Sequence, residues 1–331
     1  MTTTSVEDGT TFRPGKAMMV RALRHIVPHR GLWLMLASLY AVNMVWLAAD
    51  PRLSVAPPWP LVWVGAVVLI PLLLLWREWR AVVFDRFLSQ MFSAMLASLF
   101  ATLMMQQLSI YNHLAMSWPL PLQDDVLMAW DRALGFDWNH YAHLVAGTEW
   151  GREFLIFAYN SLINLVLGII IATSLWFGRF DRVNELAFLT LASGLVCVTV
   201  AAFFPAVSAW YSVASPETKA MLGGQPGLEW IDQFHALRGS EPVVMDLLRM
   251  EGLATFPSFH TCLGLIMAWC SRGRWSGAVL GGVSGLAVIA ATPVFGGHYL
   301  IDLLGGVVVM AGVILLWRRI APDKPSGQGR P

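Results

Sequence analysis

The chain has 331 residues, of which 56% are hydrophobic and only 13% are charged, and its mean hydropathy is +0.59. A soluble domain carries about 25% charged residues, so this composition excludes an ordinary soluble protein and indicates an integral membrane protein. The net charge of +1 gives no indication of a nucleic-acid partner. Three cysteines fall in apolar runs, with spacings that fit neither a disulfide framework nor a metal site (Cys197, Cys262 and Cys270).

The apolar runs predict an all-α fold, a polytopic membrane helix bundle of about eight transmembrane helices, because a helix needs ~20 apolar residues to cross the hydrocarbon. Residues 1–31 are polar and longer than the basic region of a signal peptide, so we expect a retained cytoplasmic segment. Residues 32–317 are the expected membrane domain, and 318–331 a cytoplasmic tail. The predicted spans are 32–49, 61–76, 88–110, 153–176, 185–204, 257–271, 275–292 and 298–317.

Basic residues are concentrated in alternate loops, and this asymmetry predicts the orientation. The N-terminal segment, the loops 77–87, 177–184 and 272–274, and the C-terminus carry them, whereas the long loops 111–152 and 205–256 are net acidic. The positive-inside rule then places both termini in the cytoplasm and the two long loops outside. The pattern fits a bacterial inner membrane or a membrane of the secretory pathway.

The first long loop contains an amphipathic stretch, "LPLQDDVLMAWDRALGFDWNHYAHLV". Leu127, Trp130 and Leu134 recur at helical spacing, and the aromatic residues Trp138 and Tyr141 follow them. One interpretation is a helix lying in the membrane interface. The other is a lid that packs over the outer face of the bundle.

Ionisable side chains mark the start of the last span, in "ATPVFGGHYLIDLLGG". His298 and Asp302 are four residues apart, a spacing that places two side chains on one face of a helix. A carboxylate there fixes the tautomer of the imidazole and leaves its other nitrogen free as a nucleophile or base. Because an ionisable group inside an apolar helix is costly, Asp302 is expected to be functional.

A second histidine opens the sixth span, in "GLATFPSFHTCLGLIMAW". His260 and His298 both begin spans at the outer face, so we expect them at one depth. The starts of both helices offer unpaired N–H groups that suit an anion. Pro257 fits a first helical turn, Ser258 can cap the helix or donate to the anion, and Gly296 and Gly297 allow the backbone to approach a ligand.

Each of these features also has a purely structural interpretation. A histidine at a helix end is often interfacial, and Pro-Ser before a helix is ordinary capping. Two histidines and an aspartate at one membrane face are harder to explain in this way, and they make a plausible acid, nucleophile and orienting group.

The motifs "PSFHT" and, about 38 residues later, "GGHYLIDLLGG" resemble the type 2 phosphatidic acid phosphatase superfamily, most closely its inositolphosphotransferase (inositol phosphorylceramide synthase)-like branch. The resemblance covers residues 255–306 and implies a six-helix phosphatase-like core with extra helices. It implies that His298 is the nucleophile, Asp302 its orienting carboxylate and His260 the general acid. It also implies that Ser258, with neighbouring backbone groups such as those around Gly297, binds phosphate.

The sequence departs from the phosphatases of this superfamily at several positions. Phe259 replaces a glycine that is common there, and Ala291 and Thr292 stand where a Ser-Arg pair precedes the nucleophile. The early Lys and Arg-Pro motif has no clean counterpart. These departures favour the transferase branch, and they leave Arg249 as our candidate for the cation that neutralises the phosphate, although a solvated loop arginine is the alternative.

The sequence therefore predicts an enzyme that acts on a lipid phosphate ester at the extracytoplasmic face, through a phosphohistidine. The acceptor is water or an alcohol, such as the polyol inositol, and no metal or cofactor is implied. Three rivals remain: a transporter with a proton relay, a haem protein ligated by His260 and His298, and a non-catalytic relative that binds lipid. The sequence does not predict the oligomeric state.

Overall fold

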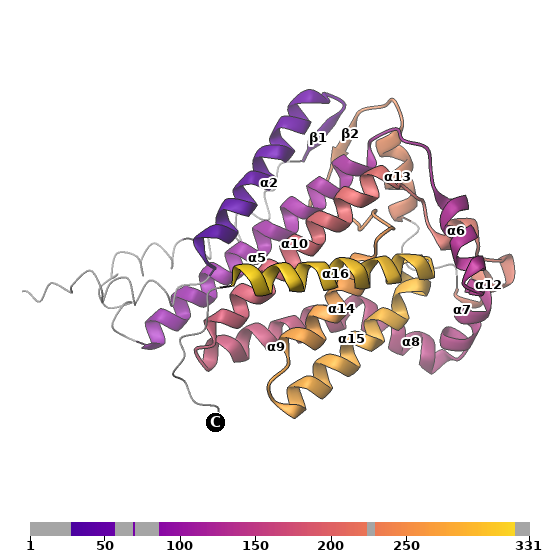
Figure 1. Cartoon of the computed structure of the whole chain (residues 1–331). Coiled ribbons are helices and arrows are strands. Elements are labelled where there is room, and N and C mark those ends of the chain that lie inside the picture. Colours follow the sequence, from indigo (N-terminus) through magenta and orange to yellow (C-terminus); the bar gives the residue numbers. More distant parts are fainter. Residues whose placement is uncertain (1–27, 57–68, 70–85, 224–228, 322–331) are drawn as a thin grey trace, which may run out of the picture.

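The computed structural model describes residues 28–56, 69, 86–223 and 229–321, most of which form α-helices (Figure 1). Six helical stretches of this described part are long and apolar enough to cross a membrane. They are α2 (Arg30–Ala49), α5 (Arg86–Met116), the continuous run of α8 (Glu149–Phe157), η1 (Ala158–Leu162) and α9 (Ile163–Trp176), then α10 (Phe180–Phe203), α15 (Trp275–Phe295) and α16 (Leu300–Ile320).

The prediction of a membrane helix bundle is confirmed, whereas the count of about eight is not. The predicted span 61–76 lies outside the described residues apart from Leu69, as do most of 1–31 and most of 318–331. The predicted span 257–271 is α14 (Phe259–Cys270), which is apolar but has only 12 residues. The third span is longer than predicted, because α5 continues through polar residues to Met116.

Short elements gather at one end of the bundle, where α6, α7 and α12 lie beside the start of α16 (Figure 1). We call the described parts of residues 117–148 and 204–256 the cap. Its helices are α6 (Asp124–Ala133), α7 (Trp138–Ala146), α11 (Ala209–Ser212), α12 (Pro216–Met221) and α13 (Glu229–Arg238). β2 (Val243–Met245) of the cap pairs in parallel with β1 (Leu53–Val55), a small sheet that the sequence analysis did not predict.

The amphipathic stretch of the first long loop forms α6 and α7, and it packs against the bundle as a lid would. Leu127 and Trp138 are almost completely buried, and α6 contacts α16. The buried face of α6 also contains Asp124 and Asp131, two turns apart, whose partners are described below.

Two apolar clusters stabilise this arrangement. One joins the cap to the adjacent ends of α5, α10, α15 and α16, and it includes Leu127, Trp210 and Phe234. The other lies between the membrane helices and includes Leu189 and Ile266. Because apolar burial contributes roughly 25 cal/mol per Å², these clusters hold the helix ends and the cap as one packed unit.

Glycines let α14 approach both of its neighbours at backbone distance. A Cβ atom built on Gly264 would lie 2.8 Å from the carbonyl oxygen of Gly285 on α15. On α16, a Cβ atom at Gly306 would lie 2.6 Å from the carbonyl oxygen of Ser258, at the start of α14. Side chains at these positions would separate the helices, so the glycines set where α14 begins relative to α16.

Candidate active site

His298 does not lie inside a helix, contrary to the prediction from its spacing. α16 begins at Leu300, Tyr299 is its N-cap residue, and His298 precedes this N-cap residue. Gly297 has a φ of +63°, a left-handed conformation that favours glycine, and it separates α15 from this start. The contact between His298 and Asp302 therefore arises from the capping geometry of α16 rather than from one face of a helix.

Asp302 is hydrogen bonded both to Tyr299, the N-cap residue of α16, and to the imidazole of His298. Its Oδ2 accepts hydrogen bonds from Nδ1 of His298 at 3.0 Å and from the backbone N–H of Tyr299 at 2.9 Å. His298 is 3% exposed and Asp302 is fully buried. Because an ionised carboxylate can only accept, the proton of the neutral imidazole belongs on Nδ1, and Nε2 keeps a free lone pair. The other oxygen of Asp302, Oδ1, has no hydrogen-bond partner among the described residues.

The start of α14 lies directly against this carboxylate-bearing turn. Ser258 is the N-cap residue, and its hydroxyl oxygen accepts from the N–H of Thr261 at 3.3 Å, as predicted for a capping serine. Its own N–H donates to the carbonyl oxygen of Asp302 at 2.9 Å. Pro257 precedes the N-cap residue Ser258, so the prediction that it belongs to the first turn of the helix was wrong. The chain reaches α16 at Pro257 because Gly305 carries no side chain there.

These contacts bring the two predicted histidines together. The ring centroids of His260 and His298 are 6.3 Å apart, with an angle of 65° between the ring planes. His260 is partly exposed, in contrast to the buried His298. A space between two such rings suits a small group that one ring attacks while the other transfers a proton.

The sequence analysis missed a third side chain at this position, Tyr159 in η1. Its ring stacks on His260 with centroids 4.5 Å apart and planes 23° apart, and its hydroxyl lies 3.5 Å from Nδ1 of His260. The hydroxyl also lies beside Gly296, where a built Cβ atom would be 2.9 Å from it and 2.8 Å from Cδ2 of His298. Gly296 is therefore the glycine that opens toward the histidines, whereas Gly297 faces Ser208 and Trp230.

The cap occupies the start of α16, so this helix does not offer its N–H groups to an anion as we expected. The carboxylate of Asp131 accepts from the N–H groups of Leu300 at 2.8 Å and Ile301 at 2.9 Å, and burial raises the pKa of this carboxyl. Tyr299 donates its hydroxyl to Asp124 at 2.9 Å.

The start of α14 is different, because no hydrogen bond within the described residues engages the N–H groups of Phe259 and His260. These two groups lie at the positive end of α14, whose N-cap residue is Ser258. If either helix start binds an anion, the accessible donors are those of α14.

Arg249, our candidate cation, does not join the histidines. Its side chain is 83% exposed and lies 3.9 Å from the carboxylate of Asp246, which fits the alternative of a solvated loop arginine. Across the described residues, the hydrogen bonds and ring contacts of Tyr159, His260, His298 and Asp302 involve no arginine or lysine.

The residues that depart from the phosphatase pattern are packing residues in this structure. Ala291 and Thr292 are fully buried in α15. Phe259 points toward α10, where a Cβ atom on Gly194 would lie 3.4 Å from its ring.

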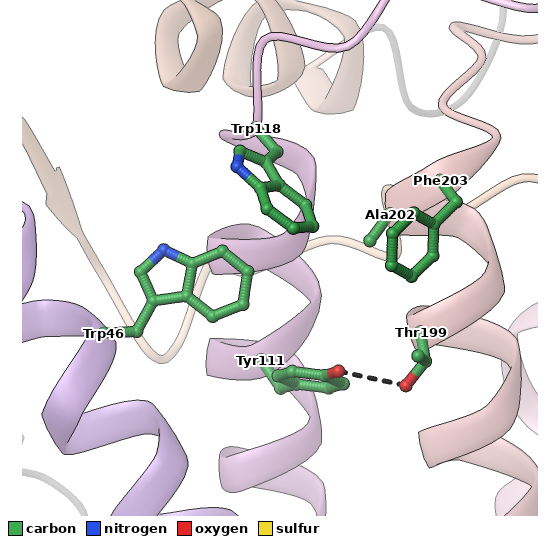
Figure 2. Close-up of a pocket in the computed structure, with 6 residues that line it drawn as sticks. All are labelled: Trp46, Tyr111, Trp118, Thr199, Ala202 and Phe203. Atoms are coloured by element: carbon green, nitrogen blue, oxygen red, sulfur yellow. Dashed lines mark hydrogen bonds between the residues drawn. The ribbon is translucent and has the colours of Figure 1, made fainter.

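Two cavities of the described residues have linings that include neither histidine of this cluster. One, of about 400 Å³, lies between α2, α5 and α10 and is mainly apolar (Figure 2). In its lining, the hydroxyls of Tyr111 and Thr199 are hydrogen bonded, 3.0 Å apart. Another, of about 380 Å³, lies under α6 and α7 and includes Asp131, Trp138 and Tyr299 in its lining. Two of its lining residues are hydrogen bonded to the cluster: Trp138 donates to the carbonyl oxygen of His298 at 3.2 Å, and the N–H of Tyr299 donates to Asp302.

The arrangement combines a buried imidazole with a free Nε2, a carboxylate that orients it, and a second imidazole across from it. Such a set can attack an electrophile, stabilise the positive charge that forms on the first ring, and move a proton at the second.

Comparison with known proteins identifies the family of this chain. The sequence profile of the PAP2 superfamily matches residues 125–316, more than half of the chain, and this range includes the two histidines and Asp302. The comparisons with curated proteins and with solved structures gave no match. The chain therefore belongs to the PAP2 superfamily, the type 2 phosphatidic acid phosphatases and their relatives, and its apolar helices make it a membrane protein of this group.

Proposed function

We propose that this protein cleaves the phosphate ester of a lipid at the extracytoplasmic face of the membrane, through a phosphohistidine at His298. The observation that carries the proposal is the 3.0 Å hydrogen bond between Nδ1 of His298 and the buried carboxylate of Asp302, with His260 facing the same ring. The placement on the outer side rests on the basic residues of the alternate loops.

In the first step, Nε2 of His298 attacks the phosphorus atom. A P–N bond forms, the P–O bond to the lipid alcohol breaks, and His260 gives a proton to the leaving oxygen. Asp302 stabilises the positive charge of the phosphorylated imidazole. In the second step, His260 takes a proton from water or from an acceptor alcohol, whose oxygen attacks the phosphorus, and the P–N bond breaks to regenerate His298.

The phosphate oxygens are bound in this proposal by backbone N–H groups at the start of α14, those of Phe259 and His260. Ser258 supports them mainly as the N-cap residue, because its hydroxyl oxygen already accepts from Thr261. Neutralisation of charge then falls on the positive end of α14 rather than on Arg249.

We further propose that the acceptor of the phosphoryl group is an alcohol rather than water. The inositolphosphotransferase-like branch is favoured by the sequence around Phe259 and by Ala291 and Thr292, which stand where phosphatases have Ser-Arg. In that branch the group bound to His298 passes to an alcohol, so the product is a new phosphate ester rather than inorganic phosphate.

The test is turnover by the purified full-length protein in detergent micelles, across a panel of phosphatidic acid, other lipid monophosphates and phosphatidylinositol, with and without added inositol. Release of inorganic phosphate from a lipid monophosphate indicates a phosphatase, and a new phosphate ester that requires the alcohol indicates a transferase: a monoester from a lipid monophosphate, or a diester from phosphatidylinositol. The variant His298→Ala should lose either activity, and His235→Ala, which changes an exposed histidine of α13, should retain it. Activity retained by His298→Ala would rule out the proposed nucleophile.

A further inference from the structure

We propose that Tyr159 is a positioning residue for His260, holding this ring in the orientation in which it protonates the leaving oxygen. This inference rests on the function proposed above, and it adds a residue that the PSFHT and GGHYLIDLL motifs do not contain. Three elements then contribute to the reacting centre: α14 through His260, the turn before α16 through His298, and η1 through Tyr159.

The ring of Tyr159 restricts the imidazole on one face. With centroids 4.5 Å apart and planes only 23° apart, the two rings are stacked, so His260 cannot rotate about its Cβ–Cγ bond without losing this contact. The other constraint is the hydroxyl of Tyr159, 3.5 Å from Nδ1 of His260. A hydroxyl at Nδ1 directs the remaining nitrogen, Nε2, away from η1.

The second observation is the position of this hydroxyl relative to His298. A Cβ atom on Gly296 would meet both the Tyr159 hydroxyl, at 2.9 Å, and Cδ2 of His298, at 2.8 Å. The phenol therefore ends beside the nucleophilic ring rather than in a separate part of the core. A tyrosine that served only as core filler would have no reason to end between the two histidines.

The backbone of η1 explains how the side chain reaches this position. Residues Ala158–Leu162 form a π-helical turn between α8 and α9. Such a turn inserts an extra residue into an α-helix, which rotates the neighbouring side chains, and it is frequent at functional sites. The turn packs against α15, the helix that ends at Phe295 just before Gly296.

A role of Tyr159 in orienting His260 predicts that its loss affects poor leaving groups more than good ones. An alkoxide needs a proton as it departs, whereas 4-nitrophenolate is a stable anion and leaves without one. When His260 is misoriented, release of the leaving group in the first turnover should therefore slow with phosphatidic acid and not with 4-nitrophenyl phosphate, whereas the second step, in which His260 acts as a base, is shared by both substrates. General acid catalysis contributes typically 10²–10⁴-fold, which sets the range of the expected loss.

The experiment compares both substrates with the purified full-length protein and two variants of Tyr159. Tyr159→Leu removes the stack and the hydroxyl, and we expect the first-turnover rate of leaving-group release to fall ~100-fold for phosphatidic acid and to change less than ~3-fold for 4-nitrophenyl phosphate. Tyr159→Phe keeps the stack, so the loss with phosphatidic acid should be only ~5-fold. Tyr111→Phe, which removes a hydroxyl hydrogen bond at the cavity of Figure 2, is the matched control and should behave as the wild type.

His260→Ala should show the same selectivity, and adding Tyr159→Leu to it should cause no further loss, because both changes remove one function. The inference is overturned if the first-turnover rate of Tyr159→Leu falls equally with both substrates, falls with neither, or if Tyr159→Leu adds its full effect to His260→Ala. A wild type inactive on both substrates, or an active His298→Ala, would instead overturn the proposed function itself.

Discussion

Gly306 offers the most direct test of how the site is assembled, because a single methyl group there would push the two motif-bearing helices apart. In Gly306→Ala, the new Cβ atom would lie 2.6 Å from the carbonyl oxygen of Ser258 and 2.9 Å from Cβ of Thr261. Neither neighbour is the flexible end of a side chain. The start of α14 must therefore move.

The size of the movement follows from the same distances. The Ser258 carbonyl would have to retreat by about 0.8 Å, from 2.6 Å to the 3.4 Å at which ordinary van der Waals contact begins. His260 lies two residues further along α14 and should be displaced by a similar amount. Overpacking of this kind costs about 1–3 kcal/mol of stability, and a misplacement near 1 Å can cost about 10²-fold in rate.

The assay pairs thermal unfolding in detergent with kcat for phosphatidic acid. Gly312→Ala is the matched control, because it lies on the same helix and nothing lies within 4 Å of its built Cβ atom. We expect Gly306→Ala to unfold at a lower temperature and to lose about 10²-fold in kcat, and Gly312→Ala to differ from the wild type by less than about 1 kcal/mol. Equal stability and equal kcat in the two variants would refute the close packing of α14 on α16.

Three further predictions concern the polar groups. Asp302→Asn keeps the shape of the orienting group but loses its charge, and kcat should fall about 10³-fold or more with little change in unfolding temperature; a loss below tenfold would contradict the orienting role. Asp131→Ala removes two hydrogen bonds from the start of α16 and should cost about 1–2 kcal/mol, whereas the exposed Asp125→Ala should be neutral in the same thermal unfolding. Rapid quenching with phosphate-labelled lipid should trap a phosphoenzyme that is acid-labile and base-stable, and its presence in His298→Ala would show that another residue carries the phosphate.

The membrane fold could be predicted from the sequence because apolar length is a direct physical requirement of the bilayer. The limits of the helices were less predictable, since helix formation continues into polar sequence wherever tertiary contacts compensate. His113 illustrates this at the end of α5, where its ring contacts Ser109 and Gln233 beyond the predicted limit of 110.

The two histidines and Asp302 could be found because their residue types are unusual in apolar surroundings. Their local geometry could not be predicted, because the spacing of four residues does not distinguish a pair on one face of a helix from a pair on either side of an N-cap residue. Tyr159 was missed because nothing in its neighbouring sequence marks a π-helical turn. Asp124 and Asp131 did leave a signal: with Leu127 between them, they lie on the buried face of α6, where an unpaired carboxylate would be too costly.

The hydrogen bonds between the cap and the start of α16 also bear on how a lipid could reach His298. Trp138 holds the carbonyl oxygen of His298, Asp131 holds the next turn, and Asp124 holds the side chain of Tyr299. Lifting the cap would therefore break the hydrogen bonds that hold the turn carrying His298. The proposed function then requires an entry route that leaves the cap in place, and a lipid that diffuses sideways from the bilayer between the helices would satisfy this requirement.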